Sequence, residues 1–318
     1  HVDVQVLDLK GKTETGTVRR LVFEDSGAYW KQVNDIVRET VSGQRAGRVL
    51  GVGIAFPGEI SPKGNIVSRS TVLGLKNFPL DHIQKNFDYP VYVEYGANAA
   101  GFGTVWRSRE LKDAVYVIVT NNGVAGSVIL NKEIYRGRYN KPGAFGHMVL
   151  NPEGRKCFCG GRGCWSAYGA LTCLTGEEDP DLEGFFKKLD RGDKGCALRW
   201  KEYLERFAQA LANIRLSFDT EIIIGGKLAP YLAPRIDELK KMVAVSLKVI
   251  AAISVVTVAA SFLLTRPLVS VFARPDNPVY DLAVTGNRIC TIALFFIGFN
   301  FFASGMFTAL SNGVVSAI

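Results

Sequence analysis

One histidine and three cysteines in a short glycine-rich stretch constrain the local fold more than any other feature of this sequence. In the run GHMVLNPEGRKCFCGGRGC they are spaced H-x9-C-x-C-x4-C, as His147, Cys157, Cys159 and Cys164. One imidazole and three thiolates form a closed tetrahedral set, which is typical of structural zinc. The neighbouring Arg155, Lys156 and Arg162 favour thiolate over thiol. We therefore expect a zinc-binding loop.

Two other interpretations of these four residues stay open at the level of sequence. They could lie in a loop without binding metal, or some of the cysteines could form a disulfide. The chain starts with HVDVQVLDLKGK, which has neither the basic nor the apolar region of a secretory signal, and this disfavours a disulfide. We expect the other three cysteines to be buried free thiols; they are Cys173, Cys196 and Cys290.

Strand-like and helix-like patterns alternate over most of the chain. Buried strands are predicted at 49–56, 91–95, 114–120 and 221–226, and amphipathic helices at 28–40 and 200–218. A further strand pair is predicted around Asn131-Lys132. This alternation indicates an α/β fold. A strand is predicted at 2–7, so the chain begins within a sheet. We therefore expect that residues before His1 are missing.

Composition narrows the class of protein and also divides the chain. With 47% hydrophobic and 21% charged residues, the chain is neither disordered nor collagen-like. The net charge of +8 permits contact with nucleic acid or anionic lipid but does not specify it. Charges are dense up to about residue 242 and sparse after it, which predicts a change of environment there.

Six segments in a fixed order carry a resemblance to a known family: GVGIAFPGEISPKGNIV, STVLGLKNFPL, VEYGANAAGFG, YRGRYNKPGAFGHM, CFCGGRGCWSAY and IIIGG. In this order they resemble the ROK (repressor–ORF–kinase) family of sugar kinases and sugar-responsive repressors. The resemblance covers about residues 1–242. It implies an actin-like, two-lobed sugar-kinase fold, incomplete at both ends, with sugar in the cleft. The lobes are expected at 1–112 and at 113–242, the second with the zinc element.

Several positions depart from the kinase pattern that this resemblance implies. Gly96 stands where the family kinases have the aspartate that acts as general base on the sugar hydroxyl. General-base catalysis contributes about 10²–10⁴-fold, and glycine cannot accept a proton. Tyr95 replaces a sugar-contacting asparagine, and Ala144 and Ser166 replace two sugar-binding glutamates. We therefore expect no kinase activity and a regulatory, sugar-sensing domain instead.

Sugar contact is expected to be weak, because only a few polar side chains remain for it. The candidates are His147, Asn98 and Ser166, and the alternative is that the domain binds no sugar. The resemblance also implies a homo-oligomer formed through residues 1–242. No helix-turn-helix pattern lies between His1 and Arg48, so direct contact with nucleic acid is not expected without a further segment.

The segment 243–318 contains two long apolar runs, 243–264 and 289–310. Each is long enough to cross about 30 Å of hydrocarbon, so an α-helical membrane hairpin is predicted, with the domain before it cytoplasmic. The runs PLVSVFARPDNPVYDLAVTGNRI and FFIGFNFFASGMFTALSNG resemble part of a multidrug and toxic compound extrusion (MATE) transporter. Two helices cannot enclose a transport pathway. The function alternatives are thus a sugar-sensing regulator fused to this segment, a transporter component, or an active sugar kinase.

Overall fold

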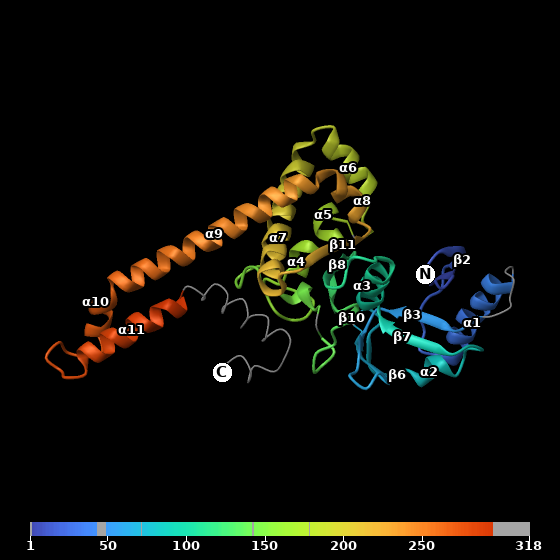
Figure 1. Cartoon of the computed structure of the whole chain (residues 1–318). Coiled ribbons are helices and arrows are strands. Elements are labelled where there is room, and N and C mark those ends of the chain that lie inside the picture. The colour runs from blue at the N-terminus through green and yellow to red at the C-terminus, as the bar shows by residue number, and fades with distance from the viewer. Residues whose placement is uncertain (1, 43–48, 71, 142, 178, 295–318) are drawn as a thin grey trace. The chain divides into compact units, whose positions relative to one another are not determined.

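The computed structural model describes residues 2–42, 49–70, 72–141, 143–177 and 179–294 (Figure 1). These residues divide into two compact units. The first unit contains the described residues of 1–117 and 126–143, and the second contains those of 118–125 and 144–318. The units therefore interleave along the chain. The predicted lobes at 1–112 and 113–242 stay a prediction, which this spatial division does not test.

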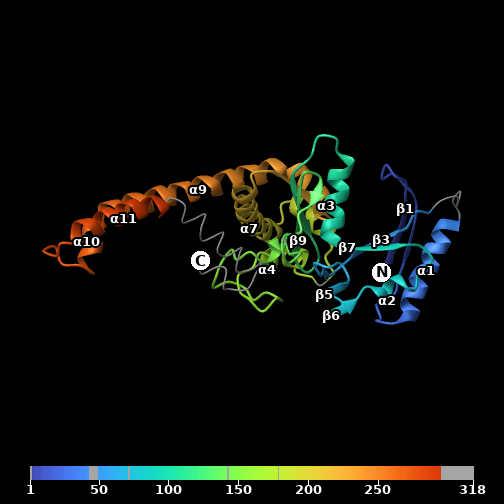
Figure 2. The same ribbon diagram turned by 60° about the horizontal axis from the view of Figure 1, so that its bottom comes forward.

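Up to residue 107, the described part of the first unit consists of small sheets with three helices. Its strands are β1 (Val2–Leu7), β2 (Thr13–Arg19), β3 (Val52–Phe56), β4 (Glu59–Ile60), β5 (Ile66–Ser70), β6 (Leu75–Pro79) and β7 (Val91–Tyr95). Its helices are α1 (Gly27–Ser42), α2 (Asp81–Gln84) and α3 (Gly96–Arg107). β1 pairs with β2 antiparallel, β3 with β7 parallel, and β4-β5-β6 form a three-stranded antiparallel sheet. Figure 2 shows β3 and β7 side by side, with β7 leading into α3.

The core of the first unit forms around α1. Trp30, Val33 and Val37 repeat at helical spacing and are all buried. Trp30 lies in one apolar cluster with Phe56 of β3 and Phe78 of β6. Full burial of a large apolar side chain contributes about 1.5–3 kcal/mol, so this cluster contributes substantially to the stability of the unit.

A four-stranded sheet has the order β10-β9-β8-β11. Its strands are β8 (Ala114–Val119), β9 (Val124–Leu130), β10 (Glu133–Ile134) and β11 (Glu221–Gly226). β9 and β10 pair antiparallel, and the turn between them holds Asn131 and Lys132 at φ of 54° and 64°. Two consecutive residues with positive φ are typical of a two-residue hairpin turn. The strand pair predicted at this dipeptide is thereby confirmed.

The second unit is mainly helical. Its α-helices are α4 (Ser166–Gly169), α5 (Leu171–Thr175), α6 (Leu182–Asp190), α7 (Lys194–Phe218), α8 (Ala229–Leu232), α9 (Ile236–Leu263), α10 (Thr265–Ser270) and α11 (Tyr280–Leu294). Two 3-10 helices are η1 (Phe145–His147) and η2 (Ala233–Arg235). In α7, Leu204, Phe207 and Leu211 form one buried face. The Asp193 side chain accepts a hydrogen bond from the Cys196 amide at 2.7 Å and caps the start of this helix.

The predicted strands and helices are found with small shifts at their ends. The strands at 91–95 and 221–226 have the predicted bounds, and the helix predicted at 28–40 spans 27–42. The helix predicted at 200–218 starts earlier, at Lys194, because Asp193 provides the cap. The strand predicted at 49–56 starts only at Val52.

The structure gives no support to the membrane hairpin predicted from segment 243–318. The first predicted span, 243–264, lies within α9, which begins with the charged residues Asp237, Glu238, Lys240 and Lys241 and packs on α7 (Figure 1 and Figure 2). Within the ranges that the structure describes, no helix combines the length and the apolar character needed to cross a bilayer. The second predicted span, 289–310, lies outside the described residues from residue 295 onward.

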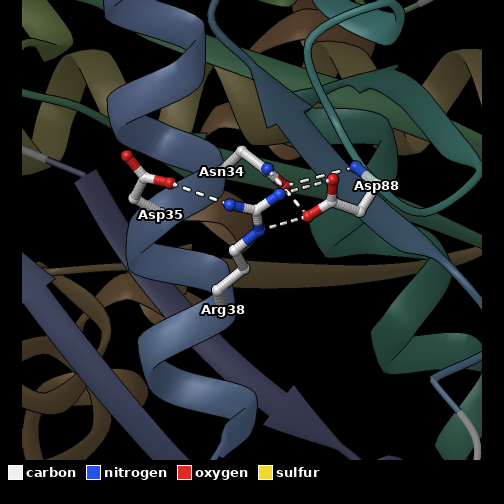
Figure 3. Close-up of polar contacts among 4 residues, drawn as sticks. All are labelled: Asn34, Asp35, Arg38 and Asp88. Carbon is white, nitrogen blue, oxygen red and sulfur yellow. Dashed lines mark hydrogen bonds and ion pairs between the residues drawn. The ribbon is translucent and has the colours of Figure 1, made fainter.

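A polar network connects α1 to the loop before β7 (Figure 3). Arg38 donates from both Nε and Nη2 to the carboxylate of Asp88, with an Nη2–Oδ1 distance of 2.8 Å. The Asn34 amide also donates to Asp88 Oδ2 at 3.0 Å. Asp35 contacts Arg38 once, at 3.5 Å. The hydrogen bonds from Arg38 and Asn34 lower the pKa of Asp88 from 3.8 to about 2.

We expect this network to make stability depend on pH in the acid range. The pKa of Asp88 is lower in the folded chain than in the unfolded chain, so its contribution is fully present above about pH 4 and is lost as the pH falls toward 2. In urea unfolding followed by circular dichroism, Asp88→Asn should lower the midpoint near neutral pH and flatten its decline below pH 4. Asp35→Asn is the control and should change the midpoint less. Equal effects of the two variants would contradict the assignment.

Candidate functional site

The four residues of the predicted zinc motif come together in the second unit. Their ligand atoms all lie within 4.8 Å of one another. His147 Nδ1 is 3.8 Å from Cys157 Sγ, and the Sγ atoms of Cys159 and Cys164 are 3.7 Å apart. With metal–sulfur bonds of about 2.3 Å, the sulfur–sulfur edge of a tetrahedral site is about 3.8 Å. The cluster therefore has the size and donor set of a tetrahedral metal site.

The cysteines exclude the disulfide alternative among the residues that the structure describes. All six are free. A disulfide has sulfur atoms about 2.05 Å apart, far closer than those of Cys159 and Cys164. Outside the cluster, Cys196 is buried as predicted and Cys173 is half-buried, whereas Cys290 is exposed on α11, contrary to the prediction.

The backbone around the cluster is a tight double turn. Antiparallel bridges join Val149 to Cys164 and Lys156 to Arg162. The Gly163 amide donates to the Arg155 carbonyl at 2.8 Å, and Gly163 has a φ of +72°. A Cβ at this position would lie 1.6 Å from the carbonyl oxygen of Asn151. Only glycine fits there, which explains why the sequence places one directly before the last ligand.

The thiols ionise unequally when no cation is present. Burial raises the pKa of Cys157 and, more strongly, that of Cys164, where the neighbouring thiols add to the effect. Burial also opposes ionisation of Cys159, but a hydrogen bond from the Gly161 backbone and contacts with the other two thiols outweigh it and lower its pKa. A divalent cation binds thiolates and would reverse this balance by displacing the protons.

The residues predicted to contact sugar are placed as follows. His147 ends η1, with its ring 5.3 Å from that of Phe158. Ser166 is buried at the start of α4, where its Oγ accepts from the Val124 amide at 3.0 Å. A Cβ at Gly146 would lie 2.3 Å from this Oγ, so Ser166 packs directly against η1. Asn98 belongs to the first unit and donates to Glu94 at 3.0 Å. Sugar contact by these residues stays a prediction.

The first unit contains a charged pair that no sequence pattern predicted. The Glu94 carboxylate pairs with Arg136 and also accepts from the Tyr95 amide at 2.9 Å. Burial would raise the pKa of Glu94, but the hydrogen bonds from Arg136 and Asn98 outweigh it and lower that pKa. The two side chains are 42 residues apart in the chain, and no local pattern connects them. Arg136 follows β10, and β10 contacts α3, the helix into which β7 leads.

Gly96, which the family resemblance places at the position of the kinase base, carries no side chain. Gly96 is the first residue of α3, and a Cβ there would meet only the Phe56 carbonyl oxygen, at 3.6 Å. The preceding Tyr95 is largely buried, and burial raises the pKa of its hydroxyl to about 12. Neither residue can take a proton from a ligand at neutral pH.

Comparison with known proteins places this geometry in a family. The family model described as "ROK family" matches residues 23–268. The xylose repressor of Bacillus subtilis (strain 168) is 34% identical over 186 residues, which cover 55% of this chain and 47% of that protein. The glucokinase of Streptomyces coelicolor is 27% identical over 223 residues, which cover 61% of this chain and 70% of that protein. The chain spans about half the length of the xylose repressors that it matches.

Solved structures share the fold. A ROK family glucokinase from Streptomyces griseus, in complex with glucose and AMPPNP, has a TM-score of 0.65 at 22% identity, covering 76% of this chain and 85% of that one. A ROK family transcriptional regulator, a homologue of the E. coli MLC protein, also has a TM-score of 0.65, at 18% identity, covering 92% and 75%. These likenesses support the predicted actin-like, ROK-type sugar-kinase fold.

The same comparisons bear on the last part of the chain. The ROK match continues to residue 268, past the boundary predicted at 242. None of these matches is to a MATE transporter, so that resemblance has no support. The predicted oligomer and the membrane partner are likewise without support in the described structure and in these matches.

The segment 147–164, which carries the four candidate ligands, is called the metal loop below. We expect the close approach of Gly163 to Asn151 to be essential for the stability of this loop. Gly163→Ala should lower the free energy of unfolding by more than the roughly 1–3 kcal/mol of a strained backbone torsion alone, because the new Cβ also collides with a carbonyl. Gly160→Ala is the matched control: its φ is +95°, but no heavy atom lies within 4 Å of its Cβ. Urea unfolding should separate the two variants. If they are equally destabilised, the backbone contact does not have this role.

Proposed function

The chain belongs to the ROK family, and on that premise we propose that it is a sugar-responsive regulatory domain with a structural zinc site and without kinase activity. Its relatives include repressors and kinases, so membership alone does not choose between them. We choose the regulatory function over the kinase function because Gly96 stands at the start of α3, where the kinase pattern requires a carboxylate.

Glu94, the carboxylate nearest to Gly96 in the sequence, is a poor replacement for the missing base. Glu94 is two residues away, but its ion pair with Arg136 and its hydrogen bond from Asn98 lower its pKa. A general base works best when its pKa is near the working pH, so a carboxylate held in this way is a weak one. Phosphoryl transfer depends on a group that orients the nucleophile, and the first unit does not provide one at this position.

The donor set supports zinc as the metal. Three sulfurs and one imidazole nitrogen are ligands that favour zinc, and four protein ligands leave no open position for a substrate. The ion would therefore be structural. It would connect η1, which carries His147, to the loop before α4, which carries the three cysteines.

A bound metal would also orient a sugar-binding group. His147 has its Nδ1 toward Cys157, so metal binding would use that nitrogen and fix the plane of the ring. Its Nε2 then becomes a hydrogen-bond donor of defined direction for a hydroxyl. Ser166 is the other proposed contact within the second unit.

The expected ligand is a monosaccharide that binds weakly. Carboxylates are missing at Ala144, Ser166 and Gly96, so a bound sugar would have few charged partners for its hydroxyls. The xylose repressor and the glucokinase among the relatives support a pentose or a hexose as the ligand class.

The proposal predicts sugar binding without ATP consumption. Calorimetric titration with glucose or xylose should show weak, saturable binding, whereas a coupled assay should detect no sugar-dependent ADP formation. Gly96→Asp should not gain activity, although the space around Gly96 admits a side chain, because the other sugar-binding carboxylates are still absent. Sugar-dependent ATP turnover by the unaltered protein would refute the regulatory assignment, and the absence of any sugar binding would refute the sensing role.

The zinc assignment predicts coupled loss of metal and stability. Cys159→Ser should abolish stoichiometric zinc in elemental analysis and lower the melting temperature, since structural zinc contributes on the order of 10 kcal/mol of binding free energy to the folded state. Cys173→Ser is the control, because this thiol lies outside the cluster, and its zinc content should be unchanged. Full zinc occupancy in Cys159→Ser would show that these residues are not the ligand set.

A further inference from the structure

A small cavity in the second unit is lined by arginine side chains from the metal loop and from α7. It has a volume of about 100 Å³ and lies between the metal loop and one face of α7. The lining residues used below are Arg155, Tyr168, Cys173, Arg199, Glu202 and Arg206. Arg199, Glu202 and Arg206 fall at positions i, i+3 and i+7 of α7, so they share one face of that helix.

The charges around this cavity do not balance. Arg155 Nη2 pairs with Glu202 Oε1 at 3.0 Å, and both side chains are about half exposed. Among the residues that the structure describes, Arg199 and Arg206 have no carboxylate partner. Three guanidinium groups therefore meet a single carboxylate, and the cavity has an excess of positive charge.

The guanidinium groups are held in place by uncharged neighbours. Arg155 and Arg206 both lie over the ring of Tyr168, 4.9 and 5.4 Å from its centroid. Arg199 donates to the carbonyl of Thr175 at 2.9 Å. Stacked, planar guanidinium groups lose little further freedom when they form hydrogen bonds. The site is therefore arranged before any ligand arrives.

Neither Cys173 nor Tyr203, which also line the cavity, adds negative charge, and burial raises the pKa of the Tyr203 hydroxyl. Burial raises the pKa of the Cys173 thiol, although Arg155 opposes this effect. The thiol is therefore neutral at physiological pH, and its Sγ is 3.3 Å from the carbonyl oxygen of Ala167.

From this arrangement we propose that the cavity binds one tetrahedral oxyanion of the phosphate type, through Arg199 and Arg206 with Arg155 at the rim. Pockets for drug-sized ligands have volumes of about 300–1,000 Å³, so a cavity of about 100 Å³ suits a single phosphate group. Arginine is well matched to phosphate because its planar fork offers two parallel donors. This site is separate from the proposed metal ligands and sugar contacts, and it would let the domain bind a second ligand besides sugar.

The first test is calorimetric titration of the full chain with inorganic phosphate at low ionic strength. We expect a single saturable site that Arg206→Met weakens about 10-fold or more, the range for loss of a charge-assisted hydrogen bond. Arg215→Met is the matched control: Arg215 is on the same helix but pairs with Asp219 at 3.1 Å, outside the cavity, and affinity should stay within about twofold. Absence of saturable binding, or equal loss in both variants, would overturn the proposal.

A second variant changes affinity in the opposite direction and so does not depend on damage to the fold. Glu202→Gln removes the only carboxylate that lines the cavity and frees Arg155, so phosphate should bind several-fold more tightly. Unchanged or weaker binding would count against the site. Titration with glycerol phosphate distinguishes two sources of the phosphate group. If the natural ligand is a phosphate ester, glycerol phosphate should bind more tightly than inorganic phosphate, and if it is free phosphate it should not. Acetate that competes as well as phosphate would refute the tetrahedral specificity.

Discussion

The close contact between Gly163 and the carbonyl of Asn151 is the constraint on which the second unit depends. It lets the segment before Cys164 lie against the segment that follows His147, and the bridge from Val149 to Cys164 continues that contact. Four ligand atoms from both sides of the turn then fall within 4.8 Å. The next residue, Trp165, is completely buried, and its ring is 5.2 Å from that of Phe207 in α7. The loop is thus anchored to a long helix at the point where its last ligand lies.

α7 serves two purposes through two of its faces. One face buries Leu204, Phe207 and Leu211 and holds α4 and the metal loop. Another face presents Arg199 and Arg206 to the cavity beside Arg155, which is itself part of the loop. Tyr168 connects the two regions, because its hydroxyl accepts from the Arg155 amide at 3.0 Å while its ring lies under two guanidinium groups. An anion at the cavity and a metal in the loop would therefore act on the same backbone.

A structural feature could be predicted from the sequence when its residues lie close together along the chain. The grouping of His147 with the three cysteines was predicted correctly, because these residues and the glycines between them all lie in the short segment from His147 to Cys164. The strands at 91–95 and 221–226 were predicted because short runs rich in valine, isoleucine and tyrosine favour strands. The pair of Glu94 and Arg136 was not, since the two residues are 42 positions apart and only the folded chain brings them together. The membrane hairpin predicted from the apolar runs at the end of the chain has no support in the described residues, where the first run lies within α9, a helix that packs on α7.

The short span of the metal ligands also has a consequence for the order of folding during synthesis. The last ligand, Cys164, leaves the ribosome well before α7 ends at Phe218. At about 5–20 residues per second, synthesis of the chain between these two points takes roughly 3–11 s. A loop of this length closes in well under a microsecond, so the ligand atoms can meet many times before their supporting helix exists. Metal captured in that interval would give the nascent chain an ordered nucleus against which α7 could later pack, so zinc supply would affect the yield of folded protein as well as its stability.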